Sequence, residues 1–141
     1  EFAAHEAALR GARLRIVSAW EVSAAYYGAL AAPIDGQAWD EFRKLAEAVV
    51  ADAQAAVRAL HPSVEVETSV VEGHAAAALL DEAGTATLIV VGNRGRGGFR
   101  SLLLGSVSQQ VSHHARCPLV IVHPPKFKSG DLRVPFTPAK Q

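Results

Sequence analysis

The hydrophobic pattern of the chain alternates between short apolar runs and longer segments with helical spacing. Apolar runs that predict strands occupy residues 13–20, 64–71, 86–91 and 119–122. Between them, apolar residues recur at intervals of three and four, which is the spacing of an amphipathic helix. Strands that alternate with helices favour right-handed crossovers and a mostly parallel sheet with helices on both faces. The pattern therefore predicts an α/β fold arranged as a three-layer sandwich.

Two of the predicted strands differ in their apolar pattern. Residues 64–71 alternate between apolar and polar side chains, which is typical of a strand with one wet face at a sheet edge. Residues 86–91 are apolar without alternation, which predicts a strand buried on both faces.

Three segments before the glycine-rich stretch carry helix signals. Residues 1–10 end at Gly11, a residue type that commonly follows a helix. An alanine-rich stretch, residues 73–83, ends in the same way at Gly84. The longest helix stops at His61-Pro62, and its spacing predicts an inward face made of Ala38, Phe42, Leu45, Ala46, Val49, Ala53, Val57 and Leu60.

Glycine is concentrated after the apolar run 86–91. Five of the eleven glycines lie between Gly92 and Gly105. Glycine lets backbone N–H groups approach a ligand closely, because no Cβ stands in the way. A tight turn in which the glycines serve only packing is the alternative interpretation.

A helix start follows the glycines. Ser106-Val107-Ser108-Gln109 matches the capping-box pattern, which predicts Ser106 as the residue that opens the helix. The free N–H groups of a first helical turn and the helix dipole attract anions, and Arg94 and Arg96 add positive charge nearby. The stretch therefore predicts a phosphate site.

The spacing Gly92-x-x-Gly95, nine residues, then Gly105-Ser106 resembles the nucleotide-binding signature of the universal stress protein family. The likeness extends through residues 91–99 and 103–108 to residues 113–122. We therefore expect a domain over residues 1–125 and a separate tail, residues 126–141, that is flexible or wraps around a dimer partner.

The resemblance implies a ligand, ATP, with a divalent ion, Mg²⁺ or Mn²⁺, carried on its phosphates. It assigns nucleotide contacts to Gly92, Asn93, Arg94, Gly95, Arg96, Gly97, Gly98, Gly105, Ser106 and Val107.

The resemblance also implies an open sheet of five strands in the order 3-2-1-4-5. In the family the first strand ends in an aspartate that contacts adenine, and no such strand precedes residues 1–10. Either the strand belongs in front of Glu1 or the protein departs from its family at the centre of the sheet. We favour the first, because losing a central strand leaves buried backbone groups unpaired at about 1–3 kcal/mol each.

The final strand, Leu119–Val122, consists of branched aliphatic residues and would form an outer edge of the sheet. An open apolar edge invites uncontrolled pairing, so something must cover it. The resemblance implies a homodimer through this strand, and coverage by the chain's own tail is the alternative.

The balance of charges and the cysteine content limit the classes of partner and the cellular compartment that the sequence favours. The 14 basic residues balance the 14 acidic ones, so no overall field favours nucleic acid or an anionic membrane. Cys117 is the single cysteine, which excludes an internal disulfide and fits a cytoplasmic protein.

Signals for dedicated catalysis are weak. His113, His114 and Cys117 make a poor tetrahedral metal set, because adjacent residues on a helix point in different directions. No P-loop lysine follows the glycines, and Glu72, Asp81 and Glu82 are indistinguishable from solvated surface acids. We expect an ATP-binding stress-response regulator rather than an enzyme. A dimeric scaffold that binds no nucleotide and a slow ATPase are the alternatives.

Overall fold

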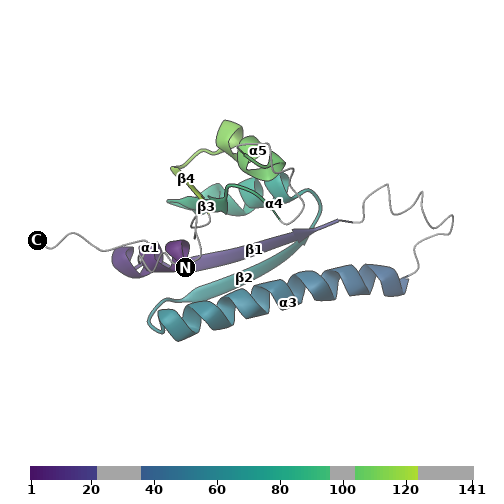
Figure 1. Ribbon diagram of the computed structural model, residues 1–141, viewed down its shortest axis with the longest axis horizontal. Coiled ribbons are helices and arrows are strands. Elements are labelled where there is room, and N and C mark those ends of the chain that lie inside the picture. Colours follow the sequence, from purple (N-terminus) through teal and green to yellow (C-terminus); the bar gives the residue numbers. More distant parts are fainter. Residues whose placement is uncertain (22–35, 96–103, 124–141) are drawn as a thin grey trace, which may run out of the picture.

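The computed structural model describes residues 1–21, 36–95 and 104–123. Helices and strands alternate along the chain, as the hydrophobic pattern predicts (Figure 1). In order, the elements are α1 (Phe2–Arg10), β1 (Leu14–Trp20), α3 (Gly36–Leu60), β2 (Val66–Glu72), α4 (Ala75–Glu82), the 3-10 turn η1 (Ala83–Thr85), β3 (Ile89–Gly92), α5 (Ser106–His114) and β4 (Leu119–Val122).

The strands pair in parallel, but the described residues do not form one five-stranded sheet. β1 pairs with β2 from Leu14↔Val66 to Trp20↔Glu72. β3 pairs with β4 from Ile89↔Leu119 to Gly92↔Val122. The described strands therefore form two separate two-stranded sheets, and β1 and β3 each keep one edge without a partner strand in this part of the chain.

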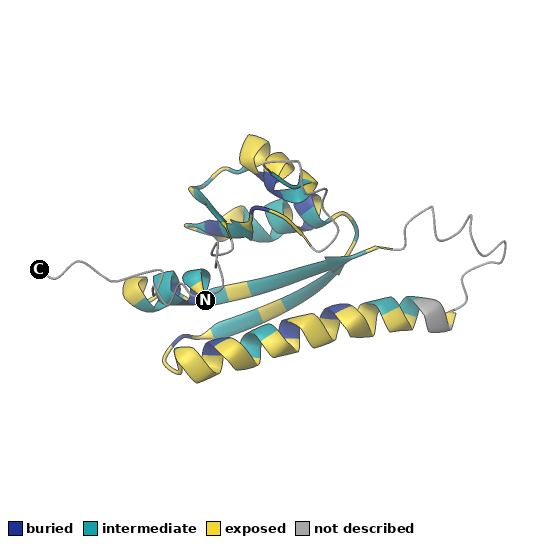
Figure 2. Cartoon of the chain, viewed as in Figure 1, coloured by how far each residue is buried: buried dark blue, intermediate teal, exposed yellow. Residues whose placement is uncertain are grey.

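The first half of the molecule consists of α1, β1, α3 and β2. The long helix α3 runs beside the β1–β2 pair, and its buried residues lie on the side that faces these strands (Figures 1 and 2). Its Val57 joins Val64 and two α1 residues, Ala4 and Ala7, in a buried apolar cluster. Gly11 follows α1 with φ 59° and ψ 32°, so the predicted glycine after this helix is confirmed.

The inward face predicted for α3 is partly wrong. Ala46 and Val57 are buried as expected, but so is Val50, which the prediction left out. The side chains of Leu45, Val49 and Leu60 are instead exposed, by 64%, 38% and 56%. Apolar residues occupy two neighbouring stripes of this helix, and the spacing of three and four does not say which stripe the strands cover.

Both tryptophans of the chain meet at the junction between β1 and α3. The rings of Trp20 and Trp39 lie 5.6 Å apart, edge to face. This contact ties the end of β1 to the first turns of α3.

The second half consists of α4, β3, α5 and β4. Its buried cluster contains Ala76, Ile89 and Val111, one each from α4, β3 and α5. Val111 has no exposed surface. Val90 and Val91 are only half-buried, so burial of this strand on both faces is not observed in the described structure.

The described part of the chain, residues 1–21, 36–95 and 104–123, holds no helix that is both long and apolar enough to cross a membrane.

Candidate functional site

The predicted phosphate site lies where β3 ends and α5 begins. β3 ends at Gly92, and α5 starts at Ser106. The N–H of Gly105 donates a 2.7 Å hydrogen bond to the carbonyl of Asn93, which brings the start of the helix against the end of the strand. Of the residues assigned to the nucleotide, Arg96, Gly97 and Gly98 lie outside the described residues. The structure brings together the remaining seven: Gly92, Asn93, Arg94, Gly95, Gly105, Ser106 and Val107.

Two buried polar residues hold this junction. Asn93 is 6% exposed and Ser108 is 2% exposed. The Ser108 hydroxyl lies 3.1 Å from the Asn93 carbonyl oxygen and 3.0 Å from the Gly105 carbonyl oxygen. Its single proton is shared between these two acceptors. The sequence gives no local sign of this role for Ser108, because a serine inside a polar helix does not reveal that its side chain turns inward.

The predicted capping box is wrong. Gly105 is the N-cap residue, with φ −77° and ψ 164°, and Ser106 is the first helical residue. Within the described residues no side chain caps the start of this helix. The backbone N–H of Gln109 bonds to the Gly105 carbonyl at 3.0 Å, and Ser106 already lies at the first helical position, one residue after the N-cap. α5 nevertheless begins at Ser106 as predicted, so the error concerns only which residue is the N-cap.

The start of α5 can act as an anion donor group. The N–H groups of Ser106, Val107 and Ser108 have no acceptor inside the helix, because no turn of α5 precedes them. Ser106 is exposed and Val107 is half-buried. Backbone donors at the positive end of a helix dipole are suited to phosphate oxygens.

The glycines of this site are not equivalent. A Cβ on Gly105 would lie 3.3 Å from the Cα of Arg94 and 3.5 Å from the Asn93 carbonyl oxygen, so a side chain there would press on the strand end. A Cβ on Gly95 would have no atom of the described residues within 4 Å, its two chain neighbours aside. Packing therefore accounts for Gly105, but it does not account for Gly95.

The described residues contain no group of three or more His, Cys, Asp and Glu side chains arranged to hold a metal ion. At the other end of α5, the Nδ1 of His114 lies 2.9 Å from the Gln110 carbonyl oxygen. A divalent ion at the glycine site would therefore depend on ligand oxygens and water, which is how Mg²⁺ is commonly held on phosphates.

A charged network joins the two halves of the molecule. Arg15 of β1 donates to Glu67 of β2 at 2.9 and 3.1 Å and to Glu82 of α4 at 3.0 Å. Ser69 donates to Glu82 at 2.7 Å, and Arg13 also pairs with Glu67. The interpretation of Glu82 as an ordinary solvated acid is therefore wrong.

The guanidinium groups of this network lower the pKa of one carboxylate, that of Glu67. The hydrogen bond from Arg15, aided by the charge of Arg13, holds the pKa of Glu67 below its ordinary value of 4.5. The same contact with Glu67 raises the pKa of Arg15.

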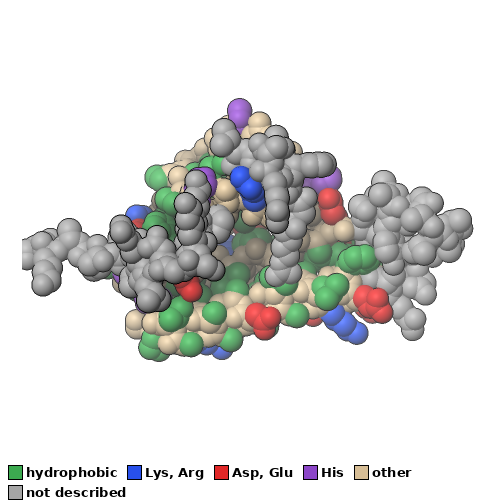
Figure 3. Space-filling view, in the orientation of Figure 1, with side chains coloured by type: hydrophobic (Ala, Val, Ile, Leu, Met, Phe, Trp, Pro, Cys, Tyr) green, Lys and Arg blue, Asp and Glu red, His purple; other side chains and the backbone are tan. Residues whose placement is uncertain are grey.

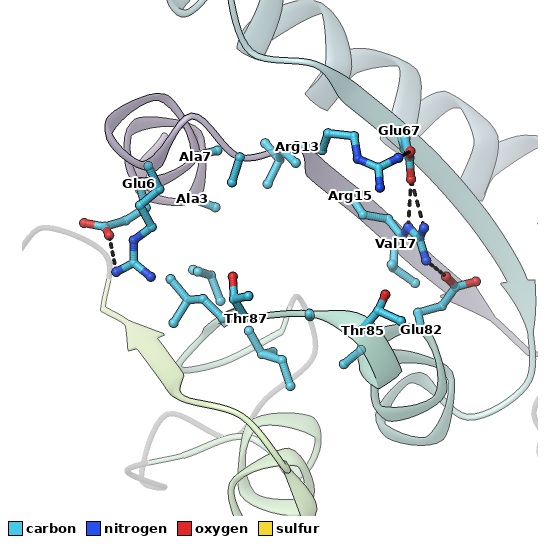
Figure 4. A pocket seen from close by; sticks show the side chains of 18 of the residues that line it. Ala3, Glu6, Ala7, Arg13, Arg15, Val17, Glu67, Glu82, Thr85 and Thr87 are labelled. Carbon is cyan, nitrogen blue, oxygen red and sulfur yellow. Dashed lines mark hydrogen bonds and ion pairs between the residues drawn. The ribbon is translucent and has the colours of Figure 1, made fainter.

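A second feature is an open cavity of about 340 Å³ between β1 and β3, which we call the β1–β3 groove. Figure 4 shows Ala3 and Ala7 of α1, Val17 of β1 and Thr87 before β3 around it, with the Arg15–Glu82 ion pair at one side. Among the described residues of the glycine segment, which we define as residues 92–98, none lines this groove. The described residues of the phosphate site and the lining of the groove are therefore different sets.

Comparisons with known proteins agree in one family. The family model described as the universal stress protein family matches residues 1–123. A universal stress protein of Mycolicibacterium smegmatis is 40% identical over 92 residues, which cover 65% of this chain and 31% of that protein. The chain thus spans about a third of the length of that curated relative.

Two solved structures resemble the chain over most of its length. One is a universal stress protein in complex with cAMP, 27% identical, with a TM-score of 0.58 over 85% of this chain and 80% of that one. The other is a protein of the same family from Burkholderia pseudomallei, also 27% identical, with a TM-score of 0.62 over 86% of this chain and 81% of that one.

Proposed function

The chain belongs to the universal stress protein family, and on that premise we propose that it is an ATP-binding regulator of the stress response. The glycine segment and the start of α5 hold the nucleotide. The observation that carries the proposal is the pair of hydrogen bonds from Gly105 N–H and Ser108 Oγ to the Asn93 carbonyl, at 2.7 and 3.1 Å. These bonds fix a helix start, with its unpaired N–H groups, beside Gly95, where the backbone is open to a ligand.

Each part of the site has a distinct role in this proposal. The N–H groups of Ser106 and Val107 donate to phosphate oxygens. Gly92 and Gly95 leave space for the ribose and phosphates, and Arg94, which is exposed, adds positive charge. A relative that is 27% identical has been solved with cAMP, which supports a nucleotide as the ligand class. Mg²⁺ or Mn²⁺, when bound, neutralises part of the phosphate charge.

We propose regulation rather than dedicated catalysis. Binding would shift the chain between two states only if the nucleotide has different affinities for them. Hydrolysis would be slow, because the described site offers no carboxylate cluster to place a metal and a water for attack. A dimeric scaffold without nucleotide remains the competing function, since Gly105 is explained by packing alone.

The wider assembly is also part of the proposal. A strand between β1 and β3 would complete the family's five-strand order 3-2-1-4-5 over a domain of residues 1–125. A homodimer would cover the outer edge of β4, Leu119–Val122, and the tail of residues 126–141 would lie outside the domain. Sedimentation of the full chain with and without ATP tests the dimer.

The proposed location of the protein is the cytoplasm.

Replacing Ser106 by proline tests the site at a single backbone donor. Proline is well accepted at the first position of a helix, and the extended backbone of Gly105 suits a residue before proline. Ser106→Pro therefore removes one N–H and keeps α5. Because a hydrogen bond to a charged group contributes about 1.5–3 kcal/mol, we expect ATP affinity to fall about tenfold or more in calorimetric titration.

Ser106→Ala is the matched control, because it removes the hydroxyl and keeps the N–H. Its affinity should stay within about threefold of the parent, since the proposed contact uses the backbone. Equal binding by the parent and Ser106→Pro would place the nucleotide elsewhere. No saturation at millimolar ATP in any of the three chains would favour the scaffold.

A further inference from the structure

Two histidines that are far apart in the sequence meet near the C-terminal end of α3. The imidazole rings of His5, in α1, and His61, the residue after α3, have centroids 5.8 Å apart and are tilted by 56°. Both residues are partly exposed, so the pair is accessible from solvent. α1 and this end of α3 lie at the same end of the molecule (Figure 1). The fold, and not the spacing along one helix, therefore brings the two rings together.

The backbone is held in place on both sides of the pair. His5 directly follows Ala4, which is buried in α1. The N–H of His61 donates to the Val57 carbonyl at 2.7 Å, and its carbonyl accepts from the N–H of Val64 at 3.0 Å. Ala4, Val57 and Val64 belong to one buried apolar cluster. This cluster fixes the two histidine backbones relative to each other, so the rings are positioned by rigid elements.

The separation of the rings fits a metal ion shared between them. A ligating imidazole nitrogen lies about 2.0–2.1 Å from a tetrahedral ion, which puts the centroids of two imidazoles on one ion about 5–6 Å apart. The 5.8 Å between His5 and His61 falls within this range. The rings of His113 and His114, adjacent on α5, are 6.5 Å apart, beyond it.

The donor atoms limit which ion could bind. Imidazole nitrogens suit Zn²⁺, Cu²⁺ and Ni²⁺, whereas Mg²⁺ and Ca²⁺ prefer oxygen ligands. Since the described residues contain no group of three or more metal-ligating side chains, water completes the coordination of an ion held by two histidines. A ligating histidine uses one ring nitrogen and keeps the other for a hydrogen bond, so coordination is compatible with other contacts of either ring.

We propose that His5 and His61 bind one divalent transition-metal ion, which clamps α1 to the end of α3. The ion differs in kind from the one proposed to ride on nucleotide phosphates, because its protein ligands are nitrogens. The proposal goes beyond nucleotide binding and does not rest on it, since neither histidine belongs to the glycine segment or to α5.

Paramagnetic broadening by Cu²⁺ tests the site in the unaltered chain. The chain has six histidines, whose ring protons are followed by nuclear magnetic resonance while substoichiometric Cu²⁺ is added without ATP. We expect the signals of His5 and His61 to broaden together and before the other four. Broadening that starts at His113 and His114, or that affects all six equally, would overturn the proposal.

Removing one ligand at a time tests the affinity. His5→Gln and His61→Gln each replace an imidazole by a polar side chain of similar size. In calorimetric titration with Zn²⁺ alone, each variant should bind at least about tenfold more weakly than the parent. Because a single remaining imidazole no longer chelates, the double variant should be within about threefold of either single one. Parent-like affinity in either single variant, or no saturation of the parent at millimolar Zn²⁺, would refute the shared ion.

The second histidine pair supplies the matched control. The double variant His113→Gln, His114→Gln should keep the affinity of the parent for Zn²⁺, and its loss would move the site to α5. Zn²⁺ should also raise the unfolding temperature of this control but not that of His5→Gln, because only an ion bound to the folded chain stabilises it. Far-UV circular dichroism checks that each variant keeps its helices. Since ATP is absent from every titration, failure of the nucleotide experiment would leave this result unchanged.

Discussion

The two halves of the molecule are built from the same kinds of element at different lengths. In the first half, strands of seven residues pair along their whole length beside a helix of 25 residues. In the second half, strands of four residues pack with helices of eight and nine. The candidate nucleotide site belongs to the second half. The difference teaches that the candidate site depends on a few well-buried groups, whereas the first half is held together by contacts spread along long elements.

The halves meet through α4 and β1. The Arg15–Glu82 pair and the Ser69–Glu82 hydrogen bond join strands of the first half to a helix of the second. These groups are partly exposed, so each contact contributes little by itself. The junction therefore positions the halves but does not replace the core of either.

The largest effect is expected from truncating the core of the short half. Val111 is fully buried in a cluster of three buried residues, so Val111→Ala should lower the free energy of unfolding by about 1–3 kcal/mol. Denaturant titration measures it. Val49→Ala on α3, where the side chain is 38% exposed, is the matched control and should cost less than about 0.5 kcal/mol. Equal losses would break the contrast between the two halves.

A smaller effect is expected at the buried hydroxyl beside the site. Ser108→Ala removes the donor to the Asn93 carbonyl and should lower the free energy of unfolding by about 1 kcal/mol. ATP affinity should fall with it, because the start of α5 loses its bond to the strand end.

Ser112 offers the comparison for this change. Its hydroxyl bonds to the Gln109 carbonyl at 2.7 Å on the exposed side of the same helix. Ser112→Ala should leave both stability and calorimetric ATP affinity near the parent values. A parent-like affinity in Ser108→Ala would show that the bond is not needed to position the phosphate donors.

The smallest effect is expected from pH at the network of the first half. The folded-state pKa of Glu67 is depressed, so its stabilisation is present above its ordinary pKa of 4.5 and is lost as pH falls through the depressed value. Glu67→Gln should flatten this acid loss when unfolding is followed at decreasing pH. Glu65→Gln, at an exposed neighbour, should keep the parent slope. Identical profiles for the parent and Glu67→Gln would contradict the pairing with Arg15.

The sequence predicted what local chemistry determines. The order of helices and strands, their parallel pairing and the glycine after α1 follow from spacing and residue type. The start of α5 at Ser106 was also predicted, because glycines and a following helix leave a local signal, although the N-cap is Gly105 and not Ser106.

The misses are features that depend on tertiary packing. Which stripe of α3 faces the strands is decided by the neighbours, so Leu45 was placed inside and Val50 was overlooked. The same holds for Ser108 and for Glu82, whose partners lie 15 residues and more than 60 residues away, at Asn93 and Arg15. No local spacing carries such information.

The contact between Trp20 and Trp39 has a practical consequence. Since these are the only indole rings in the chain and both belong to the first half, intrinsic tryptophan emission is an optical reporter of that half alone. Circular dichroism, in contrast, sums over every helix. A thermal melt in which the two signals change at different temperatures would show that the halves unfold one after the other. Coincident melting curves would show that they unfold together.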